Sequence, residues 1–179
     1  ETTGLYPSRD RIIEIAVMLL EVERASGRVL SVLDSYQGLQ DPGCPIPWEA
    51  MAVHGITDAM VKGQRIDDAR LRELLSSADL LVAHNSGFDK GFVAQIVPDA
   101  TGMTWACSCR GIPWRSLFPH APNARLQDLA EVFRIPKGTA HRAMGDVETT
   151  LNLLRLPHPA KGTTLLAHLI ASKLPLRGA

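Results

Sequence analysis

The sequence has few cysteines, no excess of either charge and no long apolar run, and each shortage excludes a class of protein. The three cysteines are an odd number without a zinc-ligand spacing, so they predict reduced thiols, as in the cytoplasm. Nineteen Lys and Arg residues balance nineteen Asp and Glu residues, which argues against binding a polyanion by charge alone. No apolar stretch approaches the roughly 20 residues that span a membrane, so no membrane partner is expected.

Apolar periodicity in these 179 residues predicts an α/β domain over residues 1–156. A hairpin is expected first, followed by alternating helices and strands in a mixed sheet. Strands are predicted over 12–22, 29–36, 80–83 and 104–107, the first of them buried on both faces. Helices are predicted over 48–53, 67–75, 88–97, 125–133 and 139–154. Residues 157–179 are expected to form a linker and a terminal amphipathic helix, which we consider as a docking element.

Three acidic residues stand where strands end or helices begin. Glu1 precedes a Thr-Thr-Gly turn, Asp89 lies in the first turn of a helix that follows a buried strand, and Asp146 lies on a late helix. Because such junctions meet at the crevice of an open α/β sheet, their carboxylates can converge on a metal ion.

A histidine precedes the last of these acids. His141 and Asp146 are five positions apart, which is about 140° around an ideal helix, so they do not share a helical face. We therefore expect His141 in the lead-in to the helix, where an imidazole beside a metal-bound carboxylate can act as a general base.

Four segments, in this order along the chain, resemble the motifs of the DEDDh branch of the 3′→5′ exonuclease superfamily, which includes the proofreading epsilon subunit of bacterial DNA polymerase III. They are Glu1-Thr2-Thr3-Gly4-Leu5, Val53-His54-Gly55-Ile56-Thr57-Asp58, His84-Asn85-Ser86-Gly87-Phe88-Asp89 and His141-x-x-x-x-Asp146. The resemblance spans residues 1 to about 154 and implies an RNase H-like mixed β-sheet flanked by helices.

The resemblance also implies two divalent ions, Mg²⁺ or Mn²⁺. Glu1 and Asp146 would bind one ion and Asp89 the other, while His141 would deprotonate the attacking water. Substrate contacts would come from the Thr2, Thr3 and Gly4 turn, from Leu5 as a wedge against the terminal base, and from His54 and Phe88. Among the basic residues, Arg142, adjacent to His141, is the best candidate to steer a phosphate backbone past the acidic site.

The family's first motif is Asp-x-Glu, so the resemblance implies a further aspartate two positions before Glu1, on a first strand of the sheet. Both would lie upstream of this sequence, which has no initiator Met and is expected to be trimmed at its N-terminus.

The sequence therefore predicts a metal-dependent 3′→5′ exonuclease that releases nucleoside monophosphates from single-stranded or frayed DNA ends. Two alternatives stay open: an RNA-directed exonuclease, and an inactive nucleic-acid-binding or scaffold module of the same fold. A DNA polymerase or another replication or repair protein is a partner that the resemblance suggests. The three tryptophans are expected to be buried or partly buried packing residues: Trp48, Trp105 and Trp114.

Overall fold

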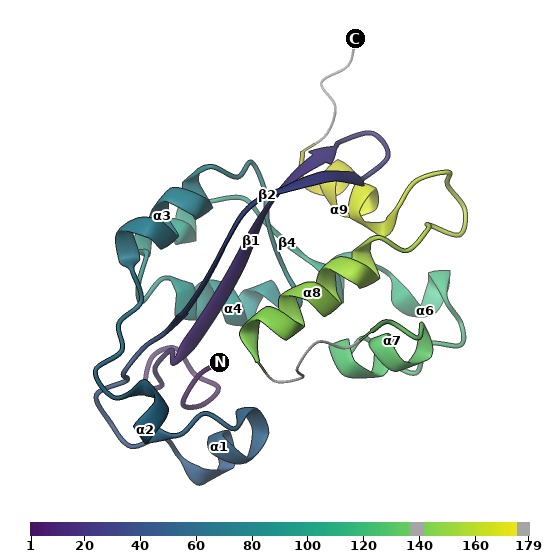
Figure 1. The fold of residues 1–179 in the computed structure, drawn as a ribbon. Helices are drawn as coiled ribbons and strands as arrows, with labels where there is room; N and C mark the ends of the chain where they lie inside the picture. Colours follow the sequence, from purple (N-terminus) through teal and green to yellow (C-terminus); the bar gives the residue numbers. More distant parts are fainter. Residues whose placement is uncertain (137–141, 175–179) are drawn as a thin grey trace.

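A long antiparallel hairpin forms the centre of the computed structural model, which describes residues 1–136 and 142–174 (Figure 1). Strand β1 (Glu14–Glu23) pairs with β2 (Arg28–Leu39) in a register that runs from Glu14 opposite Leu39 to Glu23 opposite Arg28. The turn between them contains Gly27 at φ +72°. The predicted hairpin is confirmed.

A second, parallel pair of strands follows. Strand β3 (Leu81–Ala83) pairs with β4 (Trp105–Cys107), and helix α4 (Ser86–Val93) and the 3₁₀ helix η1 (Pro98–Gly102) make the crossover between them. Antiparallel and parallel pairing therefore both occur, as expected. Within the described residues, the two pairs form separate two-stranded sheets.

The predicted helices are present. They are α1 (Trp48–His54), α3 (Asp68–Ser76), α4, α7 (Leu126–Val132), α8 (Ala143–Leu154) and α9 (Leu165–Lys173). Asp67 is the N-cap of helix α3, because its side chain accepts a hydrogen bond from the Arg70 amide. Three helices of four residues were not predicted, because one turn shows no periodicity: α2 (Asp58–Val61), α5 (Ser108–Gly111) and α6 (Trp114–Leu117).

Of the three apolar clusters in the described residues, the smallest surrounds Ile13 and Ile56 beside α1 and α2, and the two larger ones hold the remaining elements together. One lies between β1, α3 and α4, with Leu71 and Phe92 at its centre. The other lies between β4, α7, α8 and α9, with Leu129 and Leu169 fully buried. Helix α9 is thus part of the core, and Figure 1 shows it at the turn end of the hairpin. There the Thr164 amide donates to the carbonyl of Ser26.

Two expectations about burial are wrong. Strand β1 is fully buried only at its start, and its middle residues are half-buried, because in the described part of the chain β1 pairs with β2 alone. Trp114 is buried and Trp105 half-buried as expected, but the side chain of Trp48 is 71% exposed at the start of α1. A residue at a helix start can lie beyond the face that packs, and local spacing does not reveal this.

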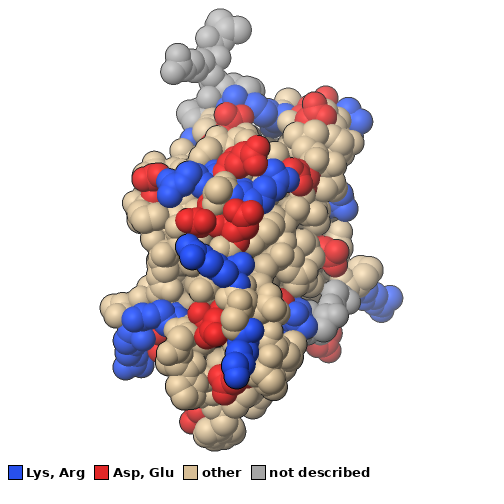
Figure 2. Space-filling model, turned by 60° about the vertical axis from the view of Figure 1, so that its left-hand side comes forward, with Lys and Arg blue, Asp and Glu red and all other residues tan. Residues whose placement is uncertain are grey.

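The surface carries both signs of charge. On the face in Figure 2, basic and acidic side chains alternate and do not gather by sign. Ion pairs such as Arg70 with Glu73, at 2.8 Å, contribute to this mixture. None of the helices in the described ranges is long and apolar enough to cross a membrane.

Candidate functional site

The N-terminal turn folds back on the chain just before β1. Thr2 forms an antiparallel bridge with Ile12, and the carbonyl of Glu1 accepts from the Ile13 amide at 2.9 Å. Thr3 is buried, and both its amide and its hydroxyl bond to the backbone of Arg11. The Thr2 hydroxyl donates to the carbonyl of Gly4 at 2.6 Å. In this structure the polar groups of the turn bond within the chain.

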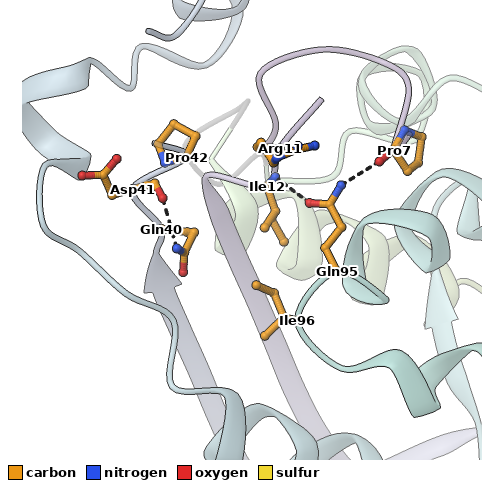
Figure 3. Close-up of a pocket in the computed structure, with 8 residues that line it drawn as sticks. All are labelled: Pro7, Arg11, Ile12, Gln40, Asp41, Pro42, Gln95 and Ile96. Atoms are coloured by element: carbon orange, nitrogen blue, oxygen red, sulfur yellow. Dashed lines mark hydrogen bonds between the residues drawn. The ribbon is translucent and has the colours of Figure 1, made fainter. Parts of the chain in front are cut away.

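Leu5 extends from this turn, and its side chain is 71% exposed. Behind the turn is a cavity of about 320 Å³ (Figure 3), in which Gln95 donates to the carbonyls of Pro7 and Asp10 and accepts from the Ile12 amide. Since Gln95 follows α4, it fixes the Leu5 loop to the helix that carries Asp89. The cavity therefore lies where the N-terminal turn is bonded to the end of α4, and Glu1, Asp89 and Asp146 are not among the residues that line it.

Asp89 lies in the first turn of α4. The residue is half-buried, yet its Oδ2 is fully buried and has no hydrogen-bond partner among the described residues. Burial, and to a smaller extent the carboxylates of Asp146 and Glu1, raise the pKa of Asp89 to about 6, against the hydrogen bond from its own amide. A buried carboxylate oxygen without a donor is costly, and a cation bound beside it would offset that cost.

Asp146 lies in the first turn of α8. Its Oδ1 accepts a hydrogen bond of 3.0 Å from Nε2 of Gln127 on α7, and its amide donates to the carbonyl of Arg142. The oxygen of the Gln127 amide is buried and lacks a hydrogen-bond partner in the described part of the chain. Gln127 thus orients Asp146 and leaves an acceptor beside it.

Arg142 precedes α8 and binds Glu14, the first residue of β1. Its Nη2 lies 2.7 Å from Oε1 of Glu14, and its Nε donates to both carboxylate oxygens. Burial alone would raise the pKa of Glu14, but the hydrogen bonds from Arg142, Ala143 and Gln37 outweigh it and lower the pKa below its usual value. The guanidinium expected to steer phosphate is therefore committed to an ion pair.

Two histidines of the motifs have different surroundings. His54 is buried at the end of α1, where its Nδ1 accepts from the Ile56 amide. Burial lowers the pKa of His54, and the charges of Glu1 and Glu14 oppose this, so the ring lies near the N-terminal turn. His84 joins the end of β3 to Ser108 Oγ and to the carbonyl of Ala124, at 2.8 Å each. It holds the loop together, as its position at a strand end indicates.

Two motif residues remain, Phe88 and His141. Phe88 is half-buried and packs against Phe92 with ring centroids 4.8 Å apart. His141 lies outside the described residues. Over 1–136 and 142–174, the carboxylates do not form a ready group of three or more metal ligands. Asp146 and Glu1 nonetheless each lie within electrostatic range of Asp89, and an all-oxygen donor set suits a hard divalent cation.

Sequence reasoning missed two residues next to this site, Glu14 and Gln127. A signal existed for Glu14, since a carboxylate that interrupts an apolar strand is seldom buried without a partner. Gln127 carried no such signal, because an amide on an amphipathic helix is normally a solvated residue.

Comparisons with known proteins identify the family of this chain. A family model described as an exonuclease matches residues 1–154. A PolC-type DNA polymerase III of Listeria innocua is 36% identical over 158 residues, which are 86% of this chain and 10% of that protein. The chain thus spans about a tenth of the length of such relatives.

Solved structures show the same fold. The zinc-bound complex of E. coli exonuclease I with single-stranded DNA superposes with a TM-score of 0.66 at 18% identity, over 98% of this chain and 40% of that one. Exonuclease X in complex with 5′-overhanging duplex DNA gives a TM-score of 0.57 at 20% identity, over 96% of this chain and 88% of that one.

Proposed function

The chain belongs to the exonuclease family, and from this premise we propose that it is the catalytic module of a metal-dependent 3′→5′ exonuclease acting on single-stranded or frayed DNA. The observation that carries the proposal is the buried Oδ2 of Asp89, which has no hydrogen-bond partner among the described residues. Burial first, and then the carboxylates of Asp146 and Glu1, raise the pKa of this residue. A buried carboxylate that further carboxylates approach closely enough to repel is expected where a cation binds.

In this proposal Glu1, Asp89 and Asp146 hold Mg²⁺ or Mn²⁺. A divalent cation bound there supplies Lewis-acid stabilisation of the phosphate and lowers the pKa of a water molecule. Gln127 keeps one oxygen of Asp146 in a fixed orientation. His141, by its place in the sequence motif, takes the proton from the attacking water.

The exposed Leu5 is suited to contact the terminal base, because unstacking that base is cheapest at single-stranded or frayed ends. Thr2, Thr3 and Gly4 shape the turn from which Leu5 extends, and Phe88 and His54 lie on the elements that flank it.

The relatives suggest a working context. Since PolC-type relatives are DNA polymerases, we place this chain beside a replicative polymerase, where it would remove misincorporated nucleotides. The three free thiols, Cys44, Cys107 and Cys109, agree with a reducing compartment such as the cytoplasm.

The test uses the protein in its complete natural sequence and a single-stranded DNA oligomer labelled at its 5′ end. We expect a ladder of shortened, still-labelled products and free nucleoside monophosphates with Mg²⁺ or Mn²⁺, and none with EDTA. Asp146→Asn should abolish the ladder without unfolding the protein. A matched RNA oligomer, digested in parallel, tests the RNA-directed alternative.

Loss of the label at the first cut would contradict 3′→5′ polarity, because a 5′ label survives only when cleavage starts at the 3′ end. Binding of the oligomer without shortening under either metal would instead support the scaffold alternative.

A further inference from the structure

Glu14 is a carboxylate at a fully buried position. Its side chain has no exposed area, whereas Arg142 opposite is 31% exposed. Oε1 accepts from Arg142 and from Nε2 of Gln37, and Oε2 accepts from Arg142 and from the Ala143 amide. Removing either charge would leave the other without its counter-ion at a desolvated place, so the two groups act as one unit.

The same carboxylate caps α8. The first amides of a helix lack partners within the helix, and the residue before it normally supplies an acceptor. Arg142 holds that position and its side chain makes no capping bond. Oε2 of Glu14 accepts from the Ala143 amide at 2.9 Å, so the cap of α8 comes from β1, far away in the sequence.

The capped turn is the one that carries Asp146. The Asp146 amide donates to the carbonyl of Arg142 at 3.1 Å, which makes residues 142–146 a single hydrogen-bonded turn. The backbone of Glu14 also bonds to Glu1, since the Glu14 amide donates to the carbonyl of Glu1 at 3.2 Å. One residue of β1 therefore contacts both the Glu1 segment, by its backbone, and the Asp146 turn, by its side chain.

We propose that Glu14 and Arg142 are a positioning pair that sets the carboxylate of Asp146 relative to that of Glu1, and that Arg142 does not bind the phosphates of the substrate. This inference rests on the proposed exonuclease activity. Two of the guanidinium nitrogens already bond to Glu14, and a pair so oriented holds the turn more rigidly than a single contact would.

The test compares Glu14→Gln, Arg142→Lys, Arg142→Gln and the double variant Glu14→Gln/Arg142→Gln in the complete protein. Each single variant should lower kcat about 10- to 100-fold, as outer contacts of metal ligands do, with KM within about threefold of wild type. The double variant should be no worse than either single variant, because both remove the same unit. Glu23→Gln, on the exposed end of the same strand, should behave as wild type.

A phosphate-binding Arg142 gives a different result. Arg142→Gln would then raise KM and reduce the salt dependence of binding, Glu14→Gln would leave KM unchanged, and the two effects would add. That outcome overturns the proposal. If Arg142→Lys recovered more than half of the kcat that Arg142→Gln loses, a contact through charge would be favoured over a fixed turn.

Hydrogen exchange at the amides of residues 143–146 gives a readout that does not need activity. In Glu14→Gln these amides should exchange at least tenfold faster, with exchange in α3 unchanged. If the wild-type protein fails to shorten DNA, the proposed function fails, and the exchange rates still decide the positioning role. Unchanged exchange in this turn would overturn it.

Discussion

Gln127 on α7 donates a hydrogen bond of 3.0 Å to Oδ1 of Asp146 on α8, and this bond joins two helices at the point where the acidic residues approach one another. The donor occupies a lone pair of Oδ1 and fixes the orientation of the Asp146 carboxylate. An amide suits this place because it orients the carboxylate without adding charge.

Replacing this donor should weaken the site without weakening the fold. We expect Gln127→Leu to lower kcat about tenfold and to raise the Mn²⁺ concentration that gives half-maximal rate, because Asp146 loses its orientation. Metal titrations of the rate check this. Asn152→Leu, on α8 and later in the chain than Asp146, is the control and should change neither value. Equal kinetics for Gln127→Leu and wild type would contradict a role for this bond.

The raised pKa of Asp89 predicts how stability depends on pH without metal. The folded form binds the proton more tightly than the unfolded form, whose pKa is near 3.8, so stability is lost as the pH rises through about 6. The loss is at most about 3 kcal/mol, because solvent reaches part of the residue and screens the effect.

Asp89→Asn removes this loss, since a carboxamide does not ionise. In EDTA, the free energy of unfolding of the variant relative to wild type should rise between pH 4 and pH 7. Adding Mn²⁺ at pH 7 should then stabilise wild type more than the variant. Urea unfolding at several pH values measures both effects, and parallel pH curves for the two proteins would refute the assignment.

The sequence predicts the elements near this site better than the contacts between them. Alternating apolar residues and 3.6-residue spacing identify β2 and α8 because these patterns are local. The cap that Glu14 gives to α8 joins two residues that lie 129 positions apart in the sequence, so no local pattern predicts it. The motif residues Asp89 and Asp146 are found by resemblance, yet Gln127, which orients one of them, is visible only in the fold.

Leu5 offers a test of substrate contact on an exposed side chain. Leu5→Ala should raise KM for single-stranded DNA about fivefold or more, because base contacts of this kind contribute about 1 to 3 kcal/mol each. The fold should be unaffected, since the side chain is 71% exposed. Leu33→Ala, at a 58% exposed position on β2, is the control for losing a surface leucine. The same KM for both variants would contradict a contact between Leu5 and the substrate.

Gly27 tests whether α9 is part of the domain. A Cβ there would lie 2.1 Å from Oγ1 of Thr164 and 2.4 Å from the amide nitrogen of Ala167, at a backbone φ of +72°. Gly43 has a similar φ of +69°, and a Cβ there would have no atom within 4 Å. The two glycines therefore share the backbone penalty but not the contact with α9.

We expect Gly43→Ala to cost about 1 kcal/mol of unfolding free energy and Gly27→Ala about 3 kcal/mol. Thermal or urea unfolding gives both values. Equal losses would indicate that the hairpin turn and α9 are not in firm contact.

The Glu14 and Arg142 pair has a consequence for the order of folding. The partners stand 128 residues apart, so during synthesis the β1–β2 hairpin is complete long before Arg142 leaves the ribosome. Until then the Glu14 carboxylate must stay hydrated, because burying it without a counter-ion is costly. The start of β1 can therefore lose its hydration only when α8 docks, so docking of α8 is a late step in folding. A nascent or partly folded chain accordingly does not hold the acidic residues in their final arrangement.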